Sequence, residues 1–240
     1  KEKEEVEKKL KEAEEEHRRL NREVEEDLKR AKRESERLLE EMEKKLDELE
    51  ERVERLLREG RDVDDLIREL LKRVRDLVRE LKKLIDESAK LVRELVKRLK
   101  KLADDNLELV RRLVKEIIDR INTTEDIIRE LKKVLEKYEK RVREIKKRLD
   151  EVLKKWEDEI RKIKEDLDRV TKKIEDDVRK NRNVREVLEK LVRDALRTLR
   201  EVLDRLRRLN EELLEVLRRV LRELERLTRE LLKVLRDALK

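Results

Sequence analysis

The sequence contains no cysteine, proline or phenylalanine, and only one glycine and one histidine. Without cysteine there can be no disulfide framework, no thiolate metal site and no thiol redox chemistry. A single glycine excludes the glycine-rich loops that cradle phosphate groups. One histidine cannot make a metal site, and paired acidic side chains occur everywhere as solvated charges. We therefore expect no catalytic residue, no cofactor-binding residue and no metal ligand.

Long hydrophobic runs are also missing. No segment approaches the roughly 20 consecutive apolar residues that a helix needs to cross a bilayer, and nothing resembles a signal peptide. The sequence predicts a soluble protein without membrane association. It carries no targeting signal, so the cellular compartment stays unknown. We expect expression in the cytoplasm.

Charge is abundant but mixed in sign. Charged residues make up 58% of the chain and hydrophobic residues 36%, a composition typical of coiled coils and long-helix proteins. The net charge is +7, from 73 basic and 66 acidic residues. Residues 1–60 are net negative and the excess of positive charge is spread evenly over the rest, without the concentrated basic patch of a nucleic-acid interface. We expect no nucleic-acid partner and no other required partner.

Only three places interrupt the helical pattern. Gly60 can adopt the left-handed conformation that ends a helix, and Asp62 can cap the next one. Asn122-Thr123-Thr124 and Asn183, with Glu186 three residues later, are further capping signals. Connections this short make each helix fold back on the one before it. The sequence thus predicts an all-α, single-chain, up-down-up-down antiparallel four-helix bundle, with residues 1–240 forming one elongated domain. The predicted helices, each about 58 residues long, are 2–59, 63–121, 124–180 and 184–239.

The apolar side chains recur with a fixed spacing. Inward positions of the first predicted helix follow steps of 4, 3, 4 and 3, and a further step of 4 begins the next block, so the pattern repeats every eighteen positions. Eighteen residues complete five turns of an undistorted helix, whereas a heptad repeat imposes a left-handed supercoil. We therefore expect a nearly straight bundle. The first two blocks are Val6, Leu10, Ala13, His17, Leu20 and Val24, Leu28, Ala31, Ser35, Leu38.

The apolar faces of the four predicted helices differ in width. At about 100° per residue, the apolar arc covers roughly 80–100° in the first and third helices and about 160° in the second and fourth. In a rhombic bundle, the helices on the short diagonal touch three neighbours. We therefore place the second and fourth helices in mutual contact and expect a monomer. The alternative is a homo-oligomer built through these two wide faces.

Uncharged polar residues at inward positions form a further pattern. Within each helix they are eighteen positions apart, and folding the chain at its three breaks brings them to two levels, about 27 Å apart along the axis. We interpret these levels as buried hydrogen-bond layers that fix register and helix pairing. An acid–base site is the alternative, but it would need a substrate cavity that the tightly spaced Leu and Val layers do not indicate. The first level holds His17, Asn106, Tyr138 and Thr228, the second holds Ser35, Ser88, Trp156 and Asn210, and a third, apolar level holds Val53, Leu70, Ile174 and Val192.

With its eighteen-position spacing, small residue alphabet, short capped connections and paired polar layers, the chain resembles the family of parametrically designed helical bundles with buried hydrogen-bond networks. The resemblance covers the whole sequence. It implies a de novo structural scaffold with a specified topology, no natural biochemical activity and no enzymatic function. The alternative function is an interaction module that self-associates, or binds another helix, through the second and fourth helices. A natural tether-like coiled coil is a third reading, but such proteins usually contain Gln, which this chain lacks.

Overall fold

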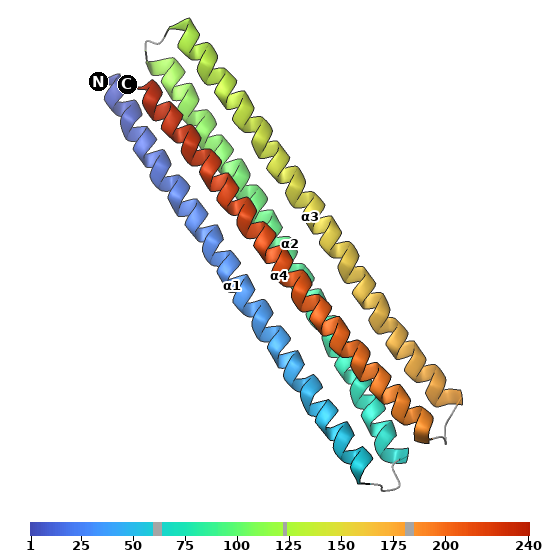
Figure 1. Ribbon diagram of the computed structural model, residues 1–240. Coiled ribbons are helices and arrows are strands. Elements are labelled where there is room, and N and C mark those ends of the chain that lie inside the picture. Colours follow the sequence, from blue (N-terminus) through green and yellow to red (C-terminus); the bar gives the residue numbers. More distant parts are fainter. Residues whose placement is uncertain (60–63, 122–123, 181–184) are drawn as a thin grey trace. The chain divides into compact units, whose positions relative to one another are not determined.

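The predicted all-α four-helix bundle is confirmed. The computed structural model describes residues 1–59, 64–121, 124–180 and 185–240, and over these residues the chain forms four long helices and no strand. Consecutive helices run antiparallel (Figure 1). The observed bounds lie within one residue of those predicted from the capping signals. The helices are α1 (Glu2–Arg58), α2 (Asp64–Arg120), α3 (Glu125–Lys180) and α4 (Arg185–Ala238).

The start of α3 shows how the sequence begins a helix. Thr124 precedes the first helical residue, and its side-chain Oγ1 accepts a hydrogen bond from the backbone N–H of Ile127 at 3.4 Å. The Thr124 carbonyl accepts the N–H of Ile128 at 3.1 Å. Thr124 therefore satisfies one of the N–H groups that a helix N-terminus leaves unpaired. The predicted caps Gly60, Asp62, Asn122, Thr123 and Asn183 lie outside the described residues.

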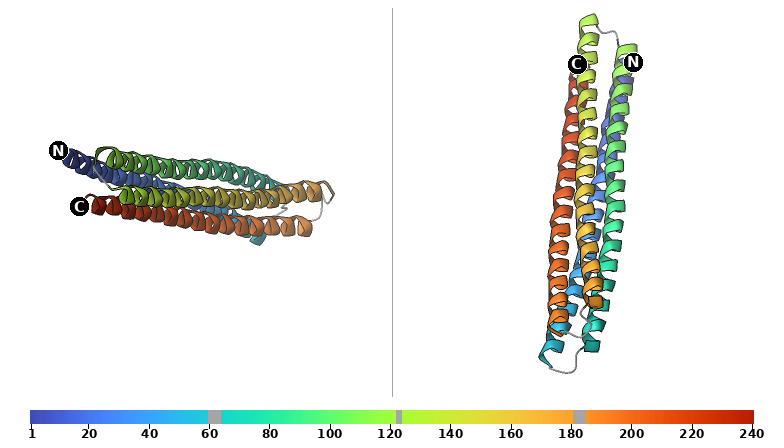
Figure 2. Two further views of the ribbon diagram at one scale, coloured as in Figure 1. Left: turned by 90° about the horizontal axis from the view of Figure 1, so that it is seen from above. Right: turned by 90° about the vertical axis from the view of Figure 1, so that its right-hand side faces the viewer.

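Figure 2 shows the four helices in two further views. The chain divides into two compact units, and each contains a segment of all four helices. In each unit the apolar faces of the four segments form the core. Fully buried side chains include Leu99, Ile117 and Ile145 in the first unit and Ile85, Ile163 and Leu199 in the second. The single elongated domain, its straightness and the axial separation of the polar levels stay predictions. The first unit comprises 1–30, 92–154 and 213–240, and the second comprises 31–91 and 155–212.

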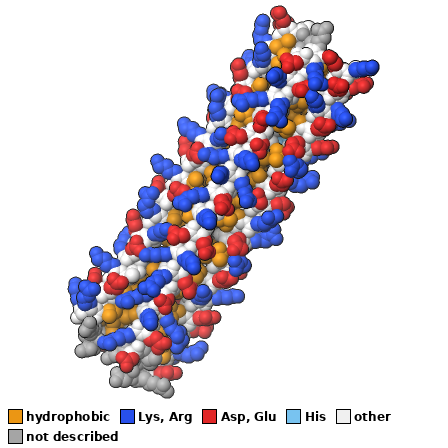
Figure 3. All heavy atoms as spheres, turned by 180° about the vertical axis from the view of Figure 1, so that it is seen from behind, with side chains coloured by type: hydrophobic (Ala, Val, Ile, Leu, Met, Phe, Trp, Pro, Cys, Tyr) orange, Lys and Arg blue, Asp and Glu red, His pale blue; other side chains and the backbone are white. Residues whose placement is uncertain are grey.

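The four helices bury unequal numbers of hydrophobic side chains. Among the described residues, α2 and α4 each bury many more than α1 or α3, as the unequal apolar arcs predicted. In the same part of the chain, Ile127 (37%) and Val234 (43%) are the large hydrophobic residues classed as exposed. Figure 3 shows positive and negative side chains intermixed over one face, with hydrophobic groups visible between them. Direct contact between α2 and α4 remains a prediction.

The structure corrects two positions in the predicted inward stripe of α1. Leu20 and Leu38 are only half-buried, whereas Asn21 and Leu39 are buried. The reason is geometric: at about 100° per residue, position i+4 lies about 40° from position i, and position i+3 lies about 60° away on the other side. Asn21 therefore lies closer to the centre of the stripe than Leu20. The repeat itself is kept, because Asn21 and Leu39 are also separated by eighteen positions.

Crossed lysine–aspartate pairs join α2 and α3 in both units. On each helix a lysine precedes an aspartate by four residues, so an antiparallel alignment places lysine against aspartate. A parallel alignment would place lysine against lysine. These exposed charges therefore distinguish the two orientations, although single surface ion pairs stabilise a protein only weakly. The pairs are Lys100–Asp150 and Lys146–Asp104 in the first unit and Lys82–Asp168 and Lys164–Asp86 in the second.

Ion pairs between α1 and α2 change sign from one repeat to the next. On α1 the partners are Lys9, Asp27 and Lys45, which are spaced by one eighteen-position repeat. Each joins an opposite charge on α2 at 2.8 Å. Sliding α2 by one repeat would preserve the apolar pattern but would place like charges together at these positions. The alternation therefore selects one register. The pairs are Lys9–Glu116 and Asp27–Arg98 in the first unit and Lys45–Glu80 in the second.

Reversing the three α1 charges together, Lys9→Glu, Asp27→Lys and Lys45→Glu, should lower the free energy of unfolding measured by urea denaturation, because each pair becomes a like-charge contact. Reversing their partners in the same protein (Glu116→Lys, Arg98→Glu, Glu80→Lys) should restore most of the loss. Equal stability of the three-fold and six-fold variants would contradict a role for these pairs in register.

Candidate functional site

The buried polar side chains are the feature of this core that could carry a function. All eight residues of the two predicted levels are buried, none more than 8% exposed. The four of the first level lie in the first unit and the four of the second level lie in the second unit. The third predicted level, Val53, Leu70, Ile174 and Val192, is buried and apolar in the second unit.

In the first unit, three side chains of α1 and α2 form a closed ring of hydrogen bonds. His17 Nδ1 lies 3.3 Å from Asn106 Oδ1, which can only accept, so Nδ1 carries the proton. Asn106 Nδ2 donates to Asn21 Oδ1 at 3.5 Å. Asn21 Nδ2 lies 3.4 Å from His17 Nε2, which therefore accepts. Each member donates once and accepts once within the ring.

A second set of bonds in the same unit joins α3 to α4. Tyr138 OH lies 2.7 Å from Thr228 Oγ1, and Thr228 Oγ1 itself donates to the backbone carbonyl of Leu224 at 2.9 Å. The threonine proton is thereby used, so the tyrosine hydroxyl is the donor between the two side chains. The result is an open chain of hydrogen bonds that ends on a backbone acceptor.

The second unit has a polar chain across three helices. Trp156 Nε1 on α3 donates to Asn210 Oδ1 on α4 at 3.3 Å, and Asn210 Nδ2 donates to Ser35 Oγ on α1 at 3.1 Å. Ser88 on α2 is also buried but lies outside this chain of bonds. Asn210 is thus the bridging residue, since it touches both ends of the chain.

These bonds differ from the four-residue networks expected for each level. Over the described residues of the first unit, the level consists of two separate sets, one between α1 and α2 and the other between α3 and α4. The chain of bonds in the second level leaves out α2. Asn21 was missed by the sequence reasoning because Leu20 was assigned to its place. A detectable signal existed, since Asn21 is a scarce uncharged polar residue four positions after His17.

Burial changes the acidity of the one tyrosine. Removal from water disfavours the phenolate and raises the pKa of Tyr138 to about 12, and the hydrogen bond to Thr228 opposes this only in part. Tyr138 is thus a neutral donor at physiological pH. It has no basic partner that would activate it for proton transfer among its hydrogen bonds.

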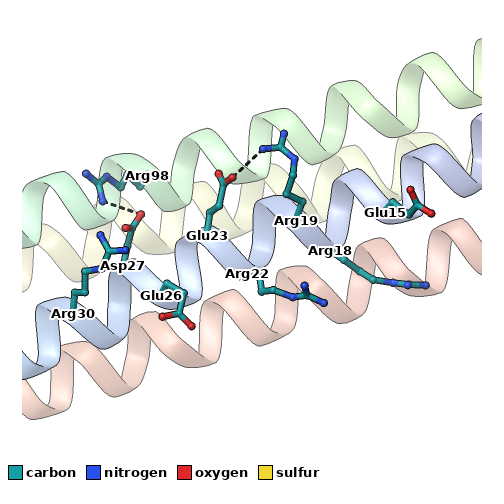
Figure 4. A pocket seen from close by; sticks show the side chains of 9 residues that line it. All are labelled: Glu15, Arg18, Arg19, Arg22, Glu23, Glu26, Asp27, Arg30 and Arg98. Carbon is teal, nitrogen blue, oxygen red and sulfur yellow. Dashed lines mark hydrogen bonds and ion pairs between the residues drawn. The ribbon is translucent and has the colours of Figure 1, made fainter.

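A hollow of about 730 Å³ lies on the outer side of α1 in the first unit (Figure 4). Eight of its nine lining residues come from α1 and Arg98 comes from α2, and all nine are charged. Arg98 is paired with Asp27, and Arg19 with Glu23. Small-molecule sites are usually concave and mostly apolar, with a few convergent polar groups. The hollow is lined by charged side chains alone and contains no nucleophile beside a base.

Metal-ligand clusters and membrane-spanning helices are also absent from the part of the chain that the structure describes. Over the described residues, no group of three or more His, Cys, Asp or Glu side chains is arranged to hold a metal ion. Nor does any helix in this part of the chain combine the length and the apolar character that a membrane span requires.

Comparison with protein-family models, with curated protein sequences and with solved structures found no match to this chain. The arrangement of buried polar groups must therefore be interpreted from its own geometry.

Replacing Asn210 by Leu should lower the free energy of unfolding by roughly 1–3 kcal/mol, because the indole N–H of Trp156 and the hydroxyl of Ser35 would be buried without a partner. Urea denaturation followed by far-UV circular dichroism measures the change in the single variant and in its control. The matched control is Asn210→Leu combined with Trp156→Phe and Ser35→Ala, which leaves no orphaned group and should recover part of the loss. Wild-type stability in the single variant would show that the chain of bonds is not formed.

Tyr138 should remain protonated well above its ordinary pKa of 10, and the rise in phenolate absorbance should be centred near pH 12. Because the unfolded state releases this proton first, the contribution to stability is complete below pH 10 and is lost as pH rises through 12. Tyr138→Phe should remove that part of the decline in the free energy of unfolding at alkaline pH. Lysines titrate in both proteins, so their contribution cancels in the difference between the two. A midpoint near pH 10 would place the hydroxyl in water.

Proposed function

We propose that this chain is a designed, coiled-coil-like structural scaffold, whose role is to hold four helices in one specified arrangement, with no natural biochemical activity. One observation carries the proposal: the apolar residues recur every eighteen positions, whereas the buried polar residues and the charges that pair α1 with α2 change from one repeat to the next. Those variable residues form bonds with other helices.

The energetic roles of the two classes support this reading. A fully buried Leu, Ile or Val contributes about 1.5–3 kcal/mol, and a hydrogen bond between neutral groups adds only about 1 kcal/mol net. The apolar repeat therefore provides the stability. The polar groups discriminate between arrangements, because a mispaired buried donor or acceptor costs more than a formed bond gains.

The alternative function is self-association or helix binding through α2 and α4. A stable protein–protein interface buries about 800 Å² on each partner and needs an apolar centre. Among the described residues of α2 and α4, Val234 is the large hydrophobic side chain classed as exposed. One such residue supplies little of the required area, so the monomeric scaffold is favoured.

Sedimentation equilibrium should give the mass of one chain, 29.6 kDa, over a wide range of protein concentration. A dimer or larger species that persists on dilution would contradict the monomeric scaffold and favour the interaction module. Val234→Lys is the informative variant in that case, since it should abolish association through the exposed side of α4 without affecting a buried contact.

A further inference from the structure

We propose that the ring of His17, Asn21 and Asn106 is a pH-sensitive latch between α1 and α2 in the first unit, closed when His17 is neutral and opened when it is protonated. The inference goes beyond the scaffold role, because it assigns a conditional contact to one place in the core. It rests on the number and direction of the hydrogen bonds in the ring.

The neutral ring is complete because its three members each supply one donor and one acceptor. An imidazolium supplies two donors and no acceptor. Its Nε2–H would point at the Asn21 amide N–H₂. If the Asn21 amide flips by 180°, its Oδ1 can accept from His17 Nε2–H. Its Nδ2 then faces Asn106 Nδ2, and both groups are donors. If the Asn106 amide flips as well, its Nδ2 faces His17 Nδ1–H, which is again a contact between two donors. No orientation of the two amides satisfies all three contacts of the ring with the imidazolium.

The surroundings of His17 offset this conflict only in part, since the charge and the backbone carbonyl of Glu225 favour the imidazolium. A groove between α1 and α4 reaches His17. Its charged lining residues are Glu14, Arg18, Arg22 and Glu25 on α1, and Glu225, Arg229, Lys233 and Arg236 on α4. Glu14 is paired with Arg236, and Glu225 with Arg229 at 2.6 Å. From α2 the facing group is the neutral Asn106, and over the described residues α3 adds no titratable group to this groove. The third carboxylate of the groove, Glu25, lies 3.9 Å from Lys29. All three carboxylates thus already have a cationic partner.

Burial acts in the same direction as the ring. His17 is 4% exposed, and desolvation lowers its pKa below the ordinary value of 6.5. The hydrogen bond to Asn106, and the charge and backbone of Glu225, oppose that shift without cancelling it, while Arg229 adds to it. The groove of about 570 Å³ between α1 and α4 reaches His17 and Asn21, so water can deliver the proton.

The surrounding segment of α1 is weakly anchored, so opening can be local. Between Leu10 and Leu28, its buried side chains are Ala13, His17, Asn21 and Val24, with no fully buried leucine. Small apolar side chains bury little area and contribute correspondingly little free energy. Elements with few buried apolar contacts open at low cost, independently of the remaining structure. The Tyr138–Thr228 bond holds α3 to α4 in the same unit and involves neither α1 nor a group that titrates near neutrality.

The sign of the pH dependence follows from the lowered pKa. The open state binds the proton more readily than the closed ring, so the latch contributes fully above pH 6.5 and weakens as pH falls toward the folded pKa of His17. Amide protection over residues 13–24 should decrease by up to about tenfold for each pH unit in that window. Protection near Tyr138 and Thr228 should stay constant.

Two measurements on the wild-type chain test the latch. Hydrogen exchange between pH 7.5 and 5, corrected for the intrinsic pH dependence of exchange, should show the local loss over residues 13–24. The ¹⁵N chemical shifts of the single histidine should identify the Nδ1–H tautomer, with a midpoint below pH 6.5. The Nε2–H tautomer, a midpoint at or above 6.5, or pH-independent protection would each overturn the proposal.

Asn21→Asp is the most informative variant, because it is nearly isosteric and changes the protonation state of His17 that closes the ring from neutral to protonated. The carboxylate can accept from both His17 Nε2–H and Asn106 Nδ2, so the ring closes with the imidazolium. Protection over residues 13–24 should then be highest while His17 is protonated and fall as pH rises through its raised pKa. Retention of the wild-type direction would overturn the latch.

Two control variants separate the ring from other effects. Glu225→Gln removes the α4 carboxylate that faces His17 and should keep the wild-type direction of the pH dependence. His17→Leu should lower local protection and make it independent of pH, since the Asn21–Asn106 bond has no titrating group. A reversed direction in Glu225→Gln, or a persistent acid-dependent loss in His17→Leu, would show that the ring is not the sensor.

Discussion

Hydrophobic burial holds these helices together. Because the apolar pattern repeats every eighteen positions, the stabilisation from burial is nearly the same in helix registers that differ by one repeat. Sliding one helix past another by one repeat places Leu and Val against Leu and Val again. A core of this kind is stable but poorly specified unless other groups penalise the alternatives. Because the apolar residues cannot distinguish one repeat from the next, that task falls to the minority of side chains that differ between repeats.

The side chains that differ act in two ways. Partly exposed charges such as Lys9 and Glu116 each contribute little stability, but their signs alternate along α1 and α2, so a shifted alignment brings like charges together. Buried groups such as Asn210 act more strongly, since a misplaced amide loses its partners in a medium without water. Stability and specificity are thus supplied by different residues.

The sequence predicts the fold well because the helical period and the capping residues are local signals. The ends of all four helices follow from a few interruptions, and Thr124 makes the hydrogen bond expected of a cap. Side-chain partners are harder to infer. The numbering brings His17, Asn106, Tyr138 and Thr228 to one level, but it cannot show which of them touch. The angular offsets of Leu20 and Asn21 from His17 differ by only about 20°, which sequence spacing does not resolve.

Hydrogen-bond direction separates the three polar sets into two kinds. The bond chain from Tyr138 through Thr228 ends on a backbone carbonyl, and the chain from Trp156 through Asn210 ends on the hydroxyl of Ser35. Such open chains contain no group that changes its donors near neutral pH. The ring around His17 is closed, so a switch of donor and acceptor at one member cannot be satisfied by reorienting the other two. Placing the only histidine in the only closed set found among the described residues couples the protonation state to helix pairing at that one position.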